Sequence, residues 1–395
     1  MRLLGEAIFM SSLAVAAPDH AFCATGLRVV FRRRTMKVAI LSLPLGGNYG
    51  GALQDYALQQ LLHGLGHEPT TCVVPFPPGH NADNRQPWEG SPLIPFLRKH
   101  VKATARLRCP LDFEQLREYG FEGYVAGSDQ IWAPSFRLRS FYSAMFMSFL
   151  PRGDQSPKVV YGASFGRAKW SLSRWLLYRW KYAPLVRRFD GVSVREDEGV
   201  EYCRRFFGVD AQVVLDPVAM HSGADFERLL SLRRRPESEA GVFAYILDPS
   251  PLKSGVCEEM RRRLGVGDVT LIGDCNRKDI EHHTMEQWLE GFMNAAFVVT
   301  DSFHGTVLSL LFHKPFAVFC NACRGASRFA SLLKPLGLED HIIDETTCLD
   351  DQFYEGIARI PDYERVEAAL APARQASLRF LRDSLEKRGA REASR

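Results

Sequence analysis

The sequence has little of several features that mark special classes of protein. Its nine cysteines are scattered and odd in number, which does not suit a disulfide framework and favours a reducing compartment. No run of about 18 apolar residues occurs, so we expect no segment that crosses a membrane. The formal net charge is only +4 over 395 residues, which argues against nucleic acid as a partner. Cys320 and Cys323 form a C-x-x-C pair without a second pair at zinc spacing, so we expect no metal.

The remaining composition is that of an ordinary soluble enzyme, with 46% hydrophobic and 24% charged residues. A chain of 395 residues is too long for one ordinary core, so we expect two α/β domains. Leu3–Ala17 resembles a weak signal peptide, but Glu6 interrupts it, and a strand-like run begins at Met36. We therefore interpret residues 1–35 as an extension outside the fold and expect a cytoplasmic protein.

Short apolar runs alternate with helical periods along most of the chain, which is typical of parallel-sheet α/β domains. The expected strands lie at 38–43, 70–74, 121–126, 158–161, 191–194, 212–215, 242–247, 269–273, 296–300 and 315–319. Most end in small or polar residues, and open α/β sheets bind ligands at the carboxyl ends of their strands. We predict two Rossmann-like domains facing across a cleft, over 36–225 and 226–350, with residues 351–395 forming a helix that packs back.

The stretch Thr300–Gly305 is the most informative single motif. It lies between a strand-like apolar run and an apolar helix, so Asp301 or Ser302 can cap that helix. A helix start offers unpaired N–H groups and the positive end of the dipole, which attract an anion. His304 lies beside this position, where an imidazole can exchange protons near neutral pH. A capped helix with a packed histidine is the alternative.

A glycine-rich loop follows the first expected strand and precedes a helix. It is neither G-x-G-x-x-G nor a P-loop, but its four glycines permit close approach of backbone to a ligand. Asn48, Tyr49 and Gly50 are therefore candidate contacts to an acceptor substrate. A tight turn without a ligand is the alternative reading of the same residues.

Six motifs occur in order along the chain and together resemble the polysaccharide pyruvyl transferase family. They are Gly-Asn-Tyr-Gly-Gly-Ala-Leu-Gln (47–54), Gly-Ser-Asp-Gln-Ile-Trp (127–132), Gly-Ala-Ser-Phe-Gly (162–166), Ser-Val-Arg-Glu (193–196), Leu-Asp-Pro (215–217) and Thr-Asp-Ser-Phe-His-Gly (300–305). The resemblance implies a GT-B-like fold and an enzyme that uses phosphoenolpyruvate to form a pyruvate ketal on a sugar of a cell-surface polysaccharide. It implies no further cofactor and a saccharide acceptor that is free or lipid-linked. It also implies that the protein associates peripherally with the inner face of the membrane.

The same resemblance implies roles for particular residues. Members of the family hold the donor with arginines and use a histidine in an Arg-x-His-Gly turn. His304 and Gly305 match this turn, whereas Ser302 occupies the arginine position. Arg195 matches another donor arginine. Arg324 and Arg328 lie soon after the next expected strand and are candidates to supply the missing charge, with a role in surface solubility as the alternative.

Three side chains at the ends of expected strands have open roles. Asp129 is a candidate general base or hydroxyl acceptor, or it closes an Asx-turn. Asp216, before a proline, is expected to shape a turn, and Trp132 either stacks on a sugar or fills the core.

Two other functions fit this pattern: a nucleotide-sugar glycosyltransferase on the same scaffold, and a non-catalytic protein that binds a polysaccharide precursor.

Overall fold

The computed structural model describes residues 34–73, 91–105, 107, 112–133, 142–166, 172–273, 283–320 and 327–393. The chain divides into two units, Met1–Arg34 and Thr35–Arg395, and the architecture described here belongs to the second. The extension expected over residues 1–35 therefore lies almost entirely outside the described residues. Arg324 and Cys323 lie outside them as well.

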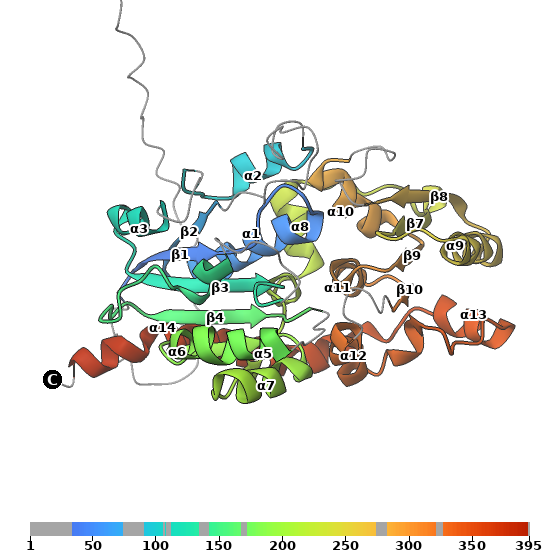
Figure 1. Ribbon diagram of the computed structural model, residues 1–395. Helices are drawn as coiled ribbons and strands as arrows, with labels where there is room; N and C mark the ends of the chain where they lie inside the picture. Colours follow the sequence, from blue (N-terminus) through green and yellow to red (C-terminus); the bar gives the residue numbers. More distant parts are fainter. Residues whose placement is uncertain are drawn as a thin grey trace, which may run out of the picture. The chain divides into compact units, whose positions relative to one another are not determined.

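Two parallel sheets organise this unit, which confirms the predicted fold class of two Rossmann-like α/β domains. The first sheet has the order β2-β1-β3-β4-β5-β6, and the second has the order β11-β10-β9-β7-β8. Their strands are β1 (Lys37–Leu41), β2 (Glu68–Cys72), β3 (Gly123–Asp129), β4 (Lys158–Ala163), β5 (Gly191–Val194), β6 (Gln212–Val213), β7 (Gly241–Tyr245), β8 (Gly267–Ile272), β9 (Phe297–Thr300), β10 (Phe316–Phe319) and β11 (Ile342–Ile343). We call the two sheets with their helices the N-lobe and the C-lobe (Figure 1).

Helices cover the sheets and connect successive strands. Those of the N-lobe are α1 (Tyr49–Gly64), α2 (Ile94–His100), α3 (Asp112–Gln115), α5 (Leu172–Leu177), α6 (Ala183–Val186), α7 (Asp197–Tyr202) and α8 (Gly223–Leu230). The π-helical turns η3 (Tyr178–Tyr182) and η4 (Cys203–Phe207) continue α5 and α7, and the short 3-10 turns include η1 (Leu116–Tyr119), η2 (Ser143–Phe146) and η5 (Pro217–Met220). Those of the C-lobe are α9 (Pro251–Leu264), α10 (Met285–Asn294), α11 (Phe303–Leu311), α12 (Ser327–Leu333), α13 (Asp351–Ala358) and α14 (Tyr363–Ala393).

The strands of the first sheet are apolar on both faces because helices cover both. Val38 and Ile40 point to a cluster that includes Leu58 of α1 and Leu381 of α14, whereas Ala39 and Leu41 point to the opposite cluster. The long helix α14, coloured red in Figure 1, thus lies against the first sheet although it follows the second in sequence.

The observed elements differ from the expected ones in a few places. The ten expected strands are present with shifts of a few residues at their ends, but the two-residue β11 carries too short a pattern to be predicted. The predicted division at residues 225 and 226 falls inside α8, because Phe226 packs in a core that also contains Trp288 of the C-lobe. Helix α14 continues through Pro372.

The apolar contact between the lobes is centred on Tyr49 at the start of α1. Its ring is 1% exposed and stacks on Trp288 of α10, with the ring centroids 5.1 Å apart. The hydroxyl of Tyr49 donates to the carbonyl of His283 at 2.6 Å. This contact fixes the start of α1, and with it the glycine-rich loop, against the C-lobe.

Replacing Trp288 by alanine should therefore destabilise the protein strongly, because the indole is 0% exposed and the cavity would open in the core that joins the lobes. We expect a loss of about 3–5 kcal/mol in the free energy of unfolding, measured by chemical denaturation. Trp180→Ala is the control, since that indole is 75% exposed and its removal should change stability little. Equal stability of the two variants would contradict the interlobe contact.

Candidate active site

The carboxyl ends of strands from both lobes bring six charged or titratable side chains together. Asp129 is the last residue of β3, Arg195 and Glu196 directly follow β5, and Asp216 precedes η5. From the C-lobe, His304 lies in the first turn of α11, and Arg328 lies in α12. The sequence placed four of these six at one site: Asp129, Arg195, His304 and Arg328.

Arg195 is the centre of this group. Its guanidinium is 1% exposed, and Nη1 donates to Oδ2 of Asp216 at 2.8 Å while Nη2 donates to Oδ1 of Asp129. Nε lies 3.9 Å from Oε2 of Glu196, and among the described residues neither atom has a hydrogen-bond partner. The predicted donor arginine is thus already engaged by two carboxylates, one at each terminal nitrogen.

The two carboxylates are held in their charged form. Burial would raise the pKa of Asp216, but His304 and Arg195 outweigh it, together with the backbone N–H of Val218, and lower the pKa to about 2. Burial also opposes the charge of Asp129, and Arg195, His304 and Arg328 lower its pKa below the ordinary value. Burial lowers the pKa of the Arg195 guanidinium, but the surrounding carboxylates more than compensate and raise it.

Arg328 supplies the second guanidinium of the site. Its side chain is 7% exposed, and Nη1 lies 3.9 Å from Oδ1 of Asp129. Burial, followed by the repulsion of Arg195, lowers its pKa to about 10, so it remains charged at neutral pH. Both guanidiniums lie over the ring of Phe303, with Cζ of Arg195 4.8 Å and Cζ of Arg328 5.6 Å from the ring centroid. Two buried cations therefore flank one aromatic ring.

His304 meets the N-lobe at two places. Its Nε2 lies 3.6 Å from Oδ2 of Asp216, and within the described part of the chain this buried nitrogen has no hydrogen-bond partner. The other side of the ring rests on Gly50, where a β-carbon would overlap Nδ1 of the imidazole. Glycine is therefore required at position 50 so that the imidazole of His304 can pack there. This is a more specific reason for glycine than the formation of a tight turn.

The remaining predicted residues of the glycine loop have structural contacts. Asn48 caps α1, with Oδ1 accepting from the N–H of Gly51 at 2.9 Å. Tyr49, predicted as an acceptor contact, is instead buried between the lobes, because it packs in the aromatic group with Trp288 and Tyr245.

The turn after β9 is also internally bonded. Ser302 caps α11 and accepts from the N–H of Gly305 at 3.4 Å, so this helix start is partly satisfied from within. Gly305 is required because a β-carbon there would overlap Oγ1 of Thr300. Asp301 accepts from the backbone N–H of Leu247 at 2.7 Å and pairs with Lys253 at 2.6 Å, which ties the turn to β7 and α9.

Sequence reasoning missed two contributions to the site. Asp216 was assigned only to a turn; it does accept from the N–H of Val218 at 2.9 Å, but it also binds Arg195. Glu196 was quoted within a motif without a role, although it accepts from the N–H of Phe165 at 3.0 Å and has a raised pKa caused by burial. The sequence signal for Glu196 was its position next to the oppositely charged Arg195 at the end of a strand. Trp132, for which two roles were open, is 0% exposed and packs on Phe146 in the core.

Among the described residues, no group of three or more His, Cys, Asp or Glu side chains is arranged to hold a metal ion. None of the helices in those ranges combines the length and apolar content required to span a bilayer.

Comparison with known proteins gives one family and several distant structures. The family model described as polysaccharide pyruvyl transferase matches residues 48–321. No curated protein sequence matches the chain.

Solved structures resemble the chain at low identity. UDP-GlcNAc 2-epimerase from Neisseria meningitidis, bound to UDP-GlcNAc, has 10% identity and a TM-score of 0.49, with 88% of this chain and 99% of that chain covered. An α-glucosyltransferase in complex with UDP and a 13-mer DNA has 10% identity and a TM-score of 0.46, covering 88% and 95%. HepE from Anabaena with UDP and glucose has 13% identity and a TM-score of 0.39, covering 91% and 99%.

The buried carboxylate of Asp216, whose pKa is lowered by His304 and Arg195, makes stability depend on pH. The pKa of Asp216 is about 2 in the folded state and 3.8 ordinarily, so its contribution is complete above pH 3.8 and is lost as the pH falls through about 2. Asp216→Asn should lower the free energy of unfolding at pH 7 by about 3–5 kcal/mol, because Arg195 loses a buried partner. In denaturation curves, we expect this difference to shrink by about 2 kcal/mol between pH 5 and pH 2.

Asp383→Asn is the matched control, since this carboxylate is 58% exposed and should change stability by less than about 1 kcal/mol. A difference between wild type and Asp216→Asn that stays constant down to pH 2 would contradict the assignment of the pair.

Proposed function

The chain belongs to the polysaccharide pyruvyl transferase family, and on this premise we propose that it transfers the pyruvyl group of phosphoenolpyruvate to a saccharide acceptor as a ketal. The acceptor is a sugar of a cell-surface polysaccharide or of its lipid-linked precursor. The single observation that best supports this activity is the burial of two guanidiniums and one imidazole at the meeting point of the strand ends.

Phosphoenolpyruvate carries a phosphate and a carboxylate, so its site requires fixed positive charge. In the described part of the site, Arg195 and Arg328 contribute two guanidiniums, and Asp129, Asp216 and Glu196 contribute three carboxyl groups. Burial and the repulsion by Arg195 lower the pKa of Arg328, and an incoming anion would offset both. We therefore propose Arg328 as the main contact of the donor, with Arg195 fixing the carboxylates around it.

Ketal formation begins with addition of a sugar hydroxyl across the double bond of the donor. His304 donates a proton to the methylene carbon, and the hydroxyl oxygen forms a bond to the carbon that bears the phosphate. Asp129, whose side chain is 22% exposed, is placed to accept the hydroxyl proton. A second hydroxyl of the same sugar then attacks this carbon and passes its proton to the neutral His304, while phosphate leaves with the bonding electrons and takes the proton held by Asp129. The methylene becomes the methyl group of the ketal.

Ligand-dependent melting separates this proposal from a nucleotide-sugar transferase. Phosphoenolpyruvate well above its Kd should raise the Tm by about 2–5 °C, whereas UDP-glucose should not. Arg328→Ala should abolish the shift, while the control Arg262→Ala, which removes an arginine paired with Glu259 on the surface of α9, should retain it. A shift with UDP-glucose alone would favour the glycosyltransferase, and no shift with either donor would favour a protein that only binds a precursor.

The proton donor can be tested by paired substitutions. His304→Ala should lower the rate of phosphoenolpyruvate-dependent pyruvylation by about 10²–10⁴-fold, measured by mass spectrometry of the glycan. Gly50→Ala should lower the rate as well, by about 10²-fold, because the added methyl displaces the imidazole.

Gly51→Ala is the control for the loop, since the nearest atom to its β-carbon would be Oδ1 of Asn48 at 3.8 Å. It should keep near-normal turnover. Full activity of Gly50→Ala, or of His304→Ala, would remove the imidazole from the mechanism.

A further inference from the structure

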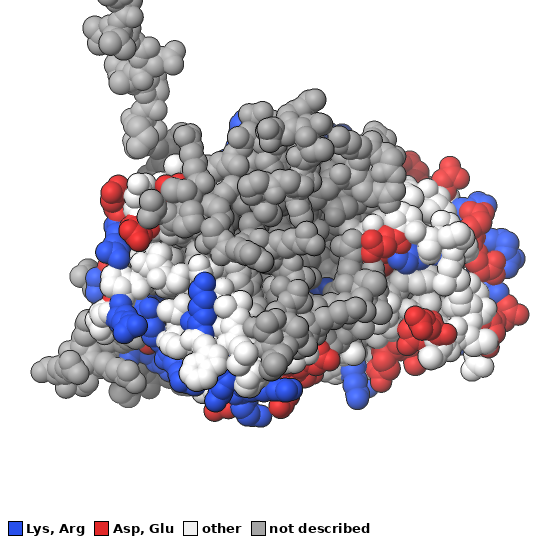
Figure 2. All heavy atoms as spheres, in the orientation of Figure 1, with Lys and Arg blue, Asp and Glu red and all other residues white. Residues whose placement is uncertain are grey.

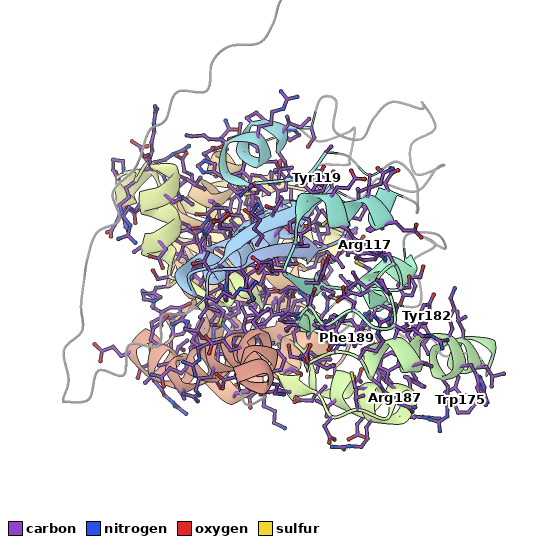
Figure 3. The ribbon with its side chains drawn as sticks, turned by 90° about the vertical axis from the view of Figure 1, so that its left-hand side faces the viewer. Arg117, Tyr119, Trp175, Tyr182, Arg187 and Phe189 are labelled. Carbon is purple, nitrogen blue, oxygen red and sulfur yellow. The ribbon has the colours of Figure 1, made fainter. Side chains whose placement is uncertain are left out.

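The helical segment that follows β4 has two distinct faces. We call it the docking segment: α5 (Leu172–Leu177), η3 (Tyr178–Tyr182) and α6 (Ala183–Val186). Its inner face is anchored in the N-lobe, where the ring of Tyr182 stacks on Phe146 with centroids 4.0 Å apart and the hydroxyl of Tyr178 donates to the carbonyl of Trp132 at 2.9 Å. In Figure 3, Tyr182 lies on the side of this segment that faces the body of the lobe. The inner face alone accounts for attachment to the fold.

The outer face carries large apolar side chains that the fold leaves in solvent. Leu176 is 39% exposed, Leu177 is 43% exposed and Trp180 is 75% exposed, and a spacing of three or four residues aligns them on one side of the helix. Pro184 extends this line and is also exposed. Of the helices and strands in the described ranges, no other set of contiguous elements exposes three large apolar residues so close together. Such a stripe indicates an interaction surface.

The sequence of this stripe carries charge of one sign. Residues 172–189 contain no Asp or Glu and five basic residues, which are Arg174, Arg179, Lys181, Arg187 and Arg188. Blue and white spheres predominate over this part of the N-lobe in Figure 2. Segments of this length without an acidic residue favour an anionic partner.

Among the described residues, the basic side chains of the docking segment and those that directly follow it form no ion pair with a carboxylate. Arg187 donates to the carbonyl of Phe207 and Arg188 to the carbonyls of Leu150 and Pro151, which are uncharged acceptors. Within the described ranges, neither Arg179 nor Lys181 forms an ion pair with a carboxylate.

Helix α9 shows the contrast. Its arginines Arg261 and Arg262 are paired with Glu258 and Glu259, at 2.5 and 2.6 Å. The exposed arginines Arg261 and Arg262 of α9 therefore have acidic partners, whereas Arg179 and Lys181 have none among the described residues.

We propose that the outer face of the docking segment binds the surface of an anionic lipid bilayer. Trp and Leu on one side of a helix insert at the boundary between headgroups and acyl chains, while flanking Arg and Lys bind acidic headgroups. A second copy of the chain is a poorer partner, because a two-fold contact would bring two positive faces together. This inference goes beyond the proposed reaction, since it concerns a surface outside the site.

The placement of the docking segment gives the interaction a consequence for the site. It follows β4, whose carboxyl end leads to Phe165, and the N–H of that residue binds Glu196 beside Arg195. Binding at the outer face would hold the carboxyl end of the first sheet near the lipid surface, where the sugar of a lipid-linked acceptor is found.

Sedimentation of the full chain with vesicles tests the proposal without any substrate. We expect binding to vesicles of phosphatidylcholine and phosphatidylglycerol, weak binding to phosphatidylcholine alone, and loss of binding as salt rises. Arg179→Ala with Lys181→Ala should weaken binding to the mixed vesicles by about 25-fold, at roughly fivefold for each charge. Trp180→Ala should weaken it by about tenfold, and Trp180→Phe should recover most of the affinity.

Two controls match these variants in exposure and charge. Ile360→Ala removes an apolar side chain that is 70% exposed in a different part of the chain, and Arg261→Ala with Arg262→Ala removes two arginines that have acidic partners. Both should bind vesicles as wild type does.

Two results would overturn the proposal. One is equal binding to both vesicle types with no effect of the substitutions. The other is a self-association in size-exclusion chromatography that Trp180→Ala abolishes while vesicle binding stays unchanged, which would make this face a contact between copies. Turnover of Trp180→Ala on a water-soluble acceptor should equal that of wild type, so failure of the docking proposal and failure of the transferase proposal remain distinguishable.

Discussion

The buried guanidinium of Arg195 is the interaction on which the arrangement of the site depends. A charge removed from water at 1% exposure is tolerated only when carboxylates surround it, and Asp129 and Asp216 supply this compensation from two different strand ends. Together with His304, this pairing keeps both carboxylates ionised, and it holds Asp216 next to His304. The motif around Arg195 therefore fixes the positions of the neighbouring carboxylates.

The contact between the lobes explains why the histidine requires the glycine-rich loop. Tyr49 and Gly50 are adjacent at the start of α1, and the first is buried against Trp288 while the second lies under the imidazole of His304. Because the aromatic contact fixes the start of the helix, the bare backbone of Gly50 can form one wall for the ring. A larger residue at position 50 could still form the start of the helix, but its side chain would overlap the imidazole of His304.

Much of this architecture was predictable from local pattern, and its limits have physical reasons. Buried parallel strands have continuous apolar sequences, so ten strands and the fold class could be predicted. Asp129 and Arg195 were identified because they are polar residues at the ends of such strands. The partnership of Arg195 with Asp216 could not be predicted, because it depends on the three-dimensional arrangement of two strand ends. Tyr49 looked like a ligand contact since Trp288, which covers it, lies far along the chain. The docking segment could not be distinguished from an ordinary surface helix by its sequence, because the sequence does not show which of its aromatic and apolar side chains are exposed.

The central claim is that the site adds a proton to the methylene carbon of phosphoenolpyruvate while a sugar oxygen binds the neighbouring carbon. Running the reaction in D2O and analysing the glycan by mass spectrometry and proton NMR tests this directly, because the new hydrogen of the methyl group must come from solvent through the imidazole. The account predicts one deuterium in the methyl group of each ketal. A product that keeps an unsaturated methylene group, or a glycan without added pyruvate, would contradict it.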